Sequence, residues 1–327
     1  MLTTLWLLLL FVVGLVVLYF GAEATLQGAV GIATRMGVSQ LVIGLTLVAF
    51  GTSCPELSLD ISAAIQGNAD LAFGDLVGSN IANVGLILGI AAIVYPLRVH
   101  MRLLRAEVPI ALSVSLLVLG LALDGVISRQ DGVMMVAAFV LFVGYSYRAA
   151  RQESLRTQRE IQETVEDGRS APRSAAMIVA GLVGLVVGAQ FMVYAAVEAA
   201  RLMGISPLII GLTIVALGTS LPELATSIVA ARRKEADIVV GNVIGSNIFN
   251  MLLVLAVVAI ISPVSVAAGS LWVDLPVMVA FVAVLIPIMV RGMVVTRAEG
   301  VLLVAGYAAF LAWQVVAALQ DASVVSG

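Results

Sequence analysis

Long apolar runs separated by short polar segments dominate this chain and predict ten membrane-spanning helices. A spanning helix needs about 20 apolar residues, and runs of that length recur between glycine, proline or clustered charge. Their approximate limits are 2–22, 39–66, 71–95, 106–123, 131–149, 174–198, 206–231, 236–261, 271–290 and 298–319. This pattern predicts an all-α polytopic membrane protein, because a β-barrel would show short alternating segments instead.

The ten runs form two groups of five that share a repeated segment. Residues 44–56 read GLTLVAFGTSCPE and residues 211–223 read GLTIVALGTSLPE, at an offset of 167. The same offset relates GSNI at 78–81 to GSNI at 245–248. We therefore expect a transmembrane repeat at 1–150 (repeated motif 44–90), a cytoplasmic link at 151–173, and a second transmembrane repeat at 174–320 (repeated motif 211–257).

Composition excludes a soluble domain and most cofactor chemistry. The 327 residues are 61% hydrophobic and only 11% charged, so we expect most of the chain to be surrounded by lipid. The single cysteine, Cys54, rules out an internal disulfide, and the single histidine, His100, argues against zinc or haem. We expect no resident cofactor, no nucleic-acid partner and no obligatory protein partner. The apolar N-terminus has no basic segment before it, so it is interpreted as the first span rather than a removed signal.

Basic residues predict the orientation. One set of alternating loops contains 15 of the 17 Lys and Arg residues, and the other set contains only Arg129 and Arg201. The first set faces the cytoplasm by the positive-inside rule, which places both termini outside an inner, plasma membrane. Five spans per repeat is an odd number, so the second repeat enters the membrane from the opposite side. The sequence thus predicts two inverted repeats.

Each repeat places a proline, a glutamate and hydroxyl groups inside a spanning run. Pro55 has no N–H and is expected to break its helix, leaving backbone carbonyls that need a partner. Thr52, Ser53 and Glu56 add oxygens at that break, and a carboxylate within a bilayer is costly and usually functional. The second repeat carries the same set: Gly218, Thr219, Ser220, Pro222 and Glu223.

The following spans add further oxygen donors. Ser79 and Asn83 lie four residues apart and hence on one helix face, and Ser246 and Asn250 repeat them. The donors are all hard oxygens, which suit Ca²⁺ or Na⁺ and not zinc or copper. Two copies of a costly feature predict one site built from both repeats.

The paired motifs GTSxPE and GSNI resemble the α-repeats of the sodium/calcium exchanger family, in its prokaryotic form without a regulatory loop. The resemblance implies a secondary antiporter that exchanges Ca²⁺ for Na⁺ by alternating access at a midplane site. It implies that Glu56 and Glu223 coordinate Ca²⁺ with Thr52 and Thr219. It also assigns flanking Na⁺ positions to the hydroxyls of Ser53, Ser79, Ser220 and Ser246 and the carbonyls of Ala49 and Ala216. Many members have Asp at Asn250, which makes K⁺ dependence less expected here.

Other functions are still possible at this point, and two further acidic residues have no assigned role. Protons could be the counter-ion, because burial favours the neutral form of a carboxyl, and a K⁺-dependent exchanger is a further alternative. An intramembrane enzyme is a remote one, because the chain shows no nucleophile–base pair. Asp60 and Asp75 align with Ser227 and Asn242. They line an outer vestibule, or Asp75 caps its helix.

Overall fold

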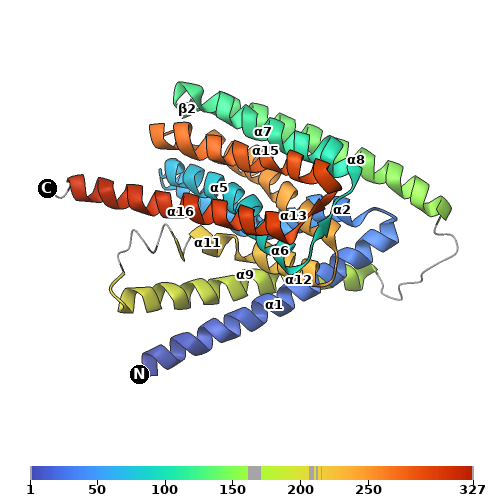
Figure 1. Ribbon diagram of the computed structural model, residues 1–327, viewed down its shortest axis with the longest axis horizontal. Helices are drawn as coiled ribbons and strands as arrows, with labels where there is room; N and C mark the ends of the chain where they lie inside the picture. Colours follow the sequence, from blue (N-terminus) through green and yellow to red (C-terminus); the bar gives the residue numbers. More distant parts are fainter. Residues whose placement is uncertain (1, 161–170, 206–209, 211–212, 215, 326–327) are drawn as a thin grey trace.

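The structure is a computed structural model that describes residues 2–160, 171–205, 210, 213–214 and 216–325. It is a bundle of long helices, and the start of α1 (Leu2–Met36) and the end of α16 (Arg297–Val325) lie at the same end (Figure 1). The described part contains 8 helices long and apolar enough to cross a membrane. The bent pair Gln40–Thr52 and Cys54–Ile65 adds a ninth candidate. The polytopic helical class is therefore confirmed, while the predicted span 206–231 falls partly outside the described residues.

The elements recur in the same order in both halves of the chain. After α1, the first half contains α2 (Gln40–Ile43), the π-helix η1 (Gly44–Val48), α3 (Ala49–Thr52), α4 (Cys54–Ile65), α5 (Ala69–Ala82), the π-helix η2 (Asn83–Leu88), α6 (Gly89–Val94), β1 (Leu97–Arg98), the π-helix η3 (Leu103–Glu107), α7 (Val108–Leu121), the 3-10 helix η4 (Ala122–Asp124), β2 (Val126–Ile127) and α8 (Arg129–Glu160). The second half contains α9 (Ala171–Leu202), α11 (Ala216–Thr219), α12 (Leu221–Arg232), α13 (Ala236–Phe249), the π-helix η6 (Asn250–Val254), α14 (Leu255–Ile261), β3 (Val264–Ser265), the π-helix η7 (Ser270–Asp274), α15 (Leu275–Gly292), β4 (Val294–Val295) and α16.

Several predicted helix ends were wrong, because a helix continues after its apolar run stops. The first span was expected to end at residue 22, but α1 runs to Met36. Its polar continuation is supported by Gln27 Nε2, which donates to Glu23 Oε1 at 3.0 Å, and by an ion pair of Glu23 with Arg233. Gly37, with φ +63°, then ends the helix in the left-handed conformation that glycine tolerates. Helices α8 and α9 likewise extend into the predicted link, to Glu160 and from Ala171.

The two halves contact each other reciprocally. Strand β1 pairs with β4, and β2 pairs with β3, both antiparallel. In the sequence, β1 and β3 lie 167 residues apart, so each half contributes equivalent strands to the two small sheets. Helices α1 and α9 pack through glycines in the same reciprocal way. A Cβ added at Gly21 would lie 2.8 Å from the Gly181 carbonyl oxygen, and one at Gly181 would lie 2.7 Å from that of Gly21. Only small residues permit such close helix contact.

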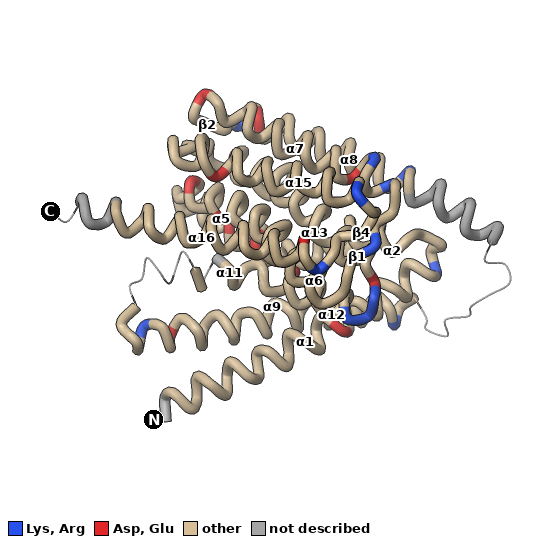
Figure 2. The backbone as a smooth tube through the Cα atoms, in the orientation of Figure 1, with Lys and Arg blue, Asp and Glu red and all other residues tan. Residues whose placement is uncertain are grey.

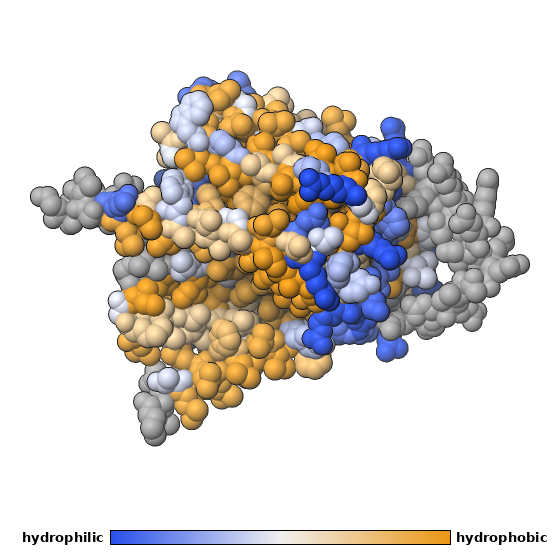
Figure 3. Space-filling model, in the orientation of Figure 1, coloured by the Kyte–Doolittle hydropathy of each residue, from blue (hydrophilic) through white to orange (hydrophobic). Residues whose placement is uncertain are grey.

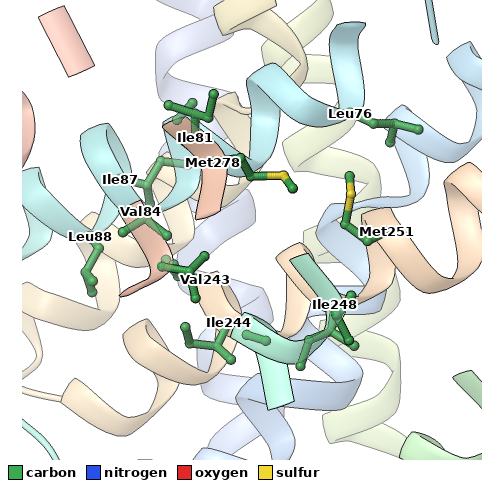
Figure 4. Packing of buried hydrophobic residues seen from close by; sticks show 14 of the residues in the cluster. Leu76, Ile81, Val84, Ile87, Leu88, Val243, Ile244, Ile248, Met251 and Met278 are labelled. Carbon is green, nitrogen blue, oxygen red and sulfur yellow. The ribbon is translucent and has the colours of Figure 1, made fainter. Parts of the chain in front are cut away.

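The helices that carry the repeated motifs form the centre of the bundle. In the spans Ala69–Val94 and Ala236–Ile261, 72% and 78% of the most apolar window is buried, against 11% for Arg297–Gln320. Figure 4 shows this core, where Val84 and Ile87 of η2 lie near Val243 and Ile244 of α13. The outer helices therefore shield the inner ones.

The outer surface matches a bilayer. Large apolar side chains cover much of the flank in Figure 3, and hydrophilic residues gather at one end. Figure 2 shows that most described Lys and Arg residues lie at that end, around β1 and β4 and the end of α12. Arg129 begins α8 and Arg201 lies in the last turn of α9, and these two helix ends lie at the opposite end of the bundle (Figure 1). The chain is thus a multi-pass integral membrane protein with one strongly basic end.

Candidate functional site

The predicted helix break is present in both repeats, at equivalent residues. Ser53 separates α3 from α4 with φ −84° and ψ 4°, and the two segments bend by 44°. Ser220 has φ −88° and ψ 4° before α12. Pro55 and Pro222 follow at the start of the new helices, where a missing N–H costs nothing. The local chemistry of proline thus starts a fresh helix in the middle of each span.

The two glutamates occupy the first turn of these new helices. Glu56 lies in the first turn of α4 and Glu223 in that of α12, and each is only 1% exposed. The positive end of a helix dipole favours a negative charge there. The two carboxyl groups are close enough to interact electrostatically. Ser53 Oγ donates to Glu223 Oε1 at 3.3 Å, so the break of the first repeat contacts the glutamate of the second.

Most of the predicted ligands end in buried atoms that no described residue satisfies. Burial of a polar atom without a partner costs about 1–3 kcal/mol, so a set of them indicates a site that a ligand completes. Among the described residues, the atoms without a hydrogen-bond partner include Glu56 Oε2, Glu223 Oε2, Ser79 Oγ, Ser220 Oγ, Ser246 Oγ, Asn83 Oδ1, and Asn250 Oδ1 and Nδ2.

Thr52 and Ala49 have protein partners already. The Thr52 hydroxyl lies 3.1 Å from the Val48 carbonyl oxygen and 3.3 Å from that of Ala49. The Ala49 carbonyl also accepts the Ser53 N–H at 3.0 Å. The break was expected to free this carbonyl, but α3 continues to Thr52 and keeps it bonded. In the second repeat, Ala216 and Thr219 begin and end α11, and Thr219 is half-buried.

Asparagines join the two central helices. Asn80 Nδ2 donates to the Asn247 carbonyl oxygen at 3.1 Å, and Asn247 Nδ2 donates to that of Asn80 at 3.2 Å. Asn83 Nδ2 donates to Asn247 Oδ1 at 3.0 Å. Asn83 Oδ1 is buried and has no hydrogen-bond partner among the described residues. Asn83 and Asn250 each begin a π-helix, a distortion that is frequent at functional sites. These hydrogen bonds fix the relative position of the two halves of the site.

Sequence reasoning missed one polar residue of this centre. Asn242 is fully buried, and its Oδ1 lies 3.2 Å from the Thr52 hydroxyl of the other repeat. The sequence contained a signal for it, because Asn242 lies one helical turn before Ser246 on the same face. Its counterpart in the first repeat is Asp75. It belongs to the polar lining of the candidate site.

The arrangement suits a hard cation held mostly by neutral oxygens. Within the described part of the chain, no three His, Cys, Asp or Glu side chains group closely enough to hold a metal ion. Two glutamates surrounded by serine, threonine and asparagine oxygens remain, which are ligands for Ca²⁺ and Na⁺ rather than for softer metals. Fold and site together define a multi-pass membrane protein with an oxygen-lined centre between two repeats.

Comparison with known proteins gives the family. A profile of the family described as "Sodium/calcium exchanger protein" matches residues 6–148 and 173–316. The chain belongs to this family, which confirms the resemblance seen in the repeated motifs.

Individual relatives agree along nearly the whole chain. The chain is 35% identical to the sodium/calcium exchanger MaX1 of Methanosarcina acetivorans, in an alignment that covers 93% of this chain and 97% of that protein. It is 39% identical over 260 residues to the inner membrane protein YrbG of Escherichia coli, covering 78% and 79%. A structure of the sodium-calcium exchanger NCX_Mj, soaked with zero Na⁺ and Ca²⁺, matches with a TM-score of 0.83 at 30% identity. That match covers 95% of this chain and 99% of the other.

Proposed function

We propose that this protein is a secondary antiporter that exchanges Ca²⁺ for Na⁺ across an inner, plasma membrane. The observation that carries the proposal is the set of buried, unpartnered oxygens around Glu56 and Glu223 in the described structure. Two glutamates balance the charge of one Ca²⁺, and Ca²⁺ takes about 6–8 oxygens in flexible geometry. Family membership and the names of its relatives support the same ions.

Each group has a proposed role. Glu56 and Glu223 bind Ca²⁺ together with Thr52 and Thr219. The flanking Na⁺ positions use the remaining oxygens, from Ser53, Ser79, Ser220, Ser246, Ala49 and Ala216, with Asn83 and Asn250 as further ligands. The Na⁺ and Ca²⁺ positions adjoin, because Ser53 Oγ donates to Glu223 Oε1. Bound cations this close repel each other, so occupancy by Na⁺ disfavours Ca²⁺. This competition couples their transport without a resident cofactor or ATP, as in a carrier rather than an enzyme.

Alternating access follows from two inverted repeats of five spans each. The recurrence of the same elements at an offset of 167 residues supports this arrangement. The reciprocal β1–β4 and β2–β3 pairs support it as well, because a two-fold relation exchanges one for the other. A site placed between such halves can open to either side by a rearrangement that exchanges their roles.

A reconstituted flux assay tests the function. Purified protein in proteoliposomes should take up Ca²⁺ when a Na⁺ gradient is imposed in the opposite direction. Uptake should persist in the presence of a protonophore, which removes any proton gradient. Ca²⁺ uptake that ignores Na⁺ and is abolished by the protonophore would establish the H⁺/Ca²⁺ alternative instead.

The proposed topology predicts opposite exposure for two equivalent loops. The basic end in Figure 2 faces the cytoplasm by the positive-inside rule, with both termini outside. Asn68 and Lys234 are both exposed, and they lie in the turns before α5 and α13. In a Cys54→Ala background, a cysteine replacing Asn68 should react with an impermeant thiol reagent only from outside. A cysteine replacing Lys234 should react only from inside. Labelling of both from one side would contradict the inverted arrangement.

Asn250 predicts transport that is independent of K⁺. Its side chain is fully buried and carries no charge, so it cannot balance a further monovalent cation beside the two glutamates. Replacing K⁺ by an inert organic cation should leave Na⁺-driven Ca²⁺ flux within about twofold, a free-energy change below about 0.5 kcal/mol. The Asn250→Asp variant should alter cation selectivity, because it adds a negative charge to a buried site. A strict K⁺ requirement in the wild type, or unchanged selectivity in the variant, would contradict this role.

A further inference from the structure

Two acids of the first repeat lie outside the ligand set described above. Asp60 follows Glu56 by one turn on α4, and Asp75 precedes Ser79 by one turn on α5. Asp60 is 1% exposed, while Asp75 is half-buried. The Oδ2 atom of each is buried and has no hydrogen-bond partner in the described part of the chain. The two carboxyl groups are close enough to interact electrostatically, and both also act on Glu56.

The second repeat shows how this pair of positions is normally satisfied. Ser227 on α12 and Asn242 on α13 are the counterparts of Asp60 and Asp75. Asn242 Nδ2 donates to Ser227 Oγ at 3.4 Å, so the two positions face each other across the helical hairpin. The first repeat has the same hairpin, α4 followed by α5, but both positions there carry carboxylates. The first repeat thus has two carboxyl groups where the second repeat has a hydrogen-bonded neutral pair.

Two facing carboxylates inside a membrane protein are stabilised by a positive partner. Each charge destabilises the other, and burial adds a desolvation cost. Among the described residues, Asp60 Oδ2 and Asp75 Oδ2 receive no hydrogen bond, so one buried oxygen of each carboxyl group has no compensating partner. A divalent cation between the two groups would neutralise both, and the partial exposure of Asp75 leaves room for water to complete its coordination.

We propose that Asp60 and Asp75 form a second Ca²⁺ position, present only in the first repeat, on the path from the outer surface to Glu56. The pair lies between the α4–α5 turn and the central site. Asp60 is separated from Glu56 by four residues, about 6 Å along the helix. A Ca²⁺ ion bound there lies next to the central site and reaches Glu56 by moving inward by one turn of α4. The direction and the transported ion rest on the proposed function, whereas the binding position itself does not.

The natural test exchanges the chemistry of one repeat for that of the other. The double variant Asp60→Ser/Asp75→Asn gives the first hairpin the residues that the second already carries. Asp70→Asn is the matched control, because Asp70 is an exposed acid in the first turn of the same helix α5. Ca²⁺ binding to the purified full chain is measured calorimetrically in Na⁺-free buffer.

We expect wild type and Asp70→Asn to bind one more Ca²⁺ per chain than the double variant. In sided proteoliposomes, the double variant should also raise the half-saturating Ca²⁺ concentration on the outer side about tenfold relative to that on the inner side. Equal binding stoichiometry and unchanged outer affinity in the double variant would overturn the proposal. If the double variant does not give a monodisperse protein, the same two measurements are made on the single variant Asp75→Asn, and the same outcomes support or overturn the proposal.

The two proposals fail in different ways. Glu56→Gln removes a central ligand but leaves the Asp60–Asp75 pair intact. Calorimetry of Glu56→Gln, with and without the double substitution, therefore measures the outer position alone. Loss of one bound Ca²⁺ on adding the double substitution supports the outer position even where the wild type does not exchange Ca²⁺ for Na⁺. No loss in that background overturns the outer position while the exchange proposal stands on its flux assay.

Discussion

Glu56→Gln and Glu223→Gln should each abolish Ca²⁺ transport. Each variant keeps the size of the side chain but removes half of the charge that balances the ion, in a site where both residues are 1% exposed. Loss of one partner of a buried charge pair costs about 3–5 kcal/mol. At about 1.4 kcal/mol per tenfold change, this predicts a loss of at least about 100-fold in the Na⁺-driven Ca²⁺ flux of proteoliposomes.

The control for this prediction is Glu198→Gln. Glu198 lies near the end of α9 and pairs with Arg201 at 2.7 Å, with both side chains partly exposed. A surface pair of this kind contributes about 0–1 kcal/mol, so its flux should stay close to that of the wild type. Wild-type flux in purified Glu56→Gln or Glu223→Gln would refute the assignment of the site.

Gly245→Ala should have the second largest effect, through packing rather than charge. A Cβ at Gly245 of α13 would lie 2.5 Å from the Leu45 carbonyl oxygen and 2.7 Å from the Ala49 Cβ. Neither backbone can retreat without separating α13 from η1 and α3. Overpacking of this kind costs about 1–3 kcal/mol. We therefore expect a lower melting temperature. We also expect a reduced Ca²⁺ flux, because the proposed ligands Ser246 and Thr52 lie within three residues of Gly245 and Ala49, respectively.

Gly120→Ala is the matched control on α7. Gly120 is exposed, and no described atom lies within 4 Å of the Cβ that the substitution would add. Its stability should change by no more than about 0.5 kcal/mol, because an exposed helical alanine displaces nothing. Thermal unfolding of both variants in the same detergent gives the comparison. Equal melting temperatures would show that the close approach at Gly245 is dispensable.

The sequence by itself determined the class, the repeat and the candidate chemistry, because these depend on local or periodic properties. Apolar runs of bilayer length predict spans whatever their neighbours are. Pro55 and Pro222 break their helices because the missing N–H acts within one turn. The 167-residue offset is visible in the residues alone, and it singled out Glu56 and Glu223 without any structure.

Only the tertiary structure decided which atoms meet. Ser53 contacts Glu223, and Thr52 contacts Asn242, because helices of opposite repeats cross at glycines that permit backbone contact. The periodicity of the sequence within each repeat does not predict where helices of opposite repeats cross. The same packing extends α1 to Met36 beyond its apolar run, through the ion pair of Glu23 with Arg233. It also leaves a buried oxygen of Asp60 and one of Asp75 without a partner among the described residues, at positions whose counterparts Ser227 and Asn242 bond to each other.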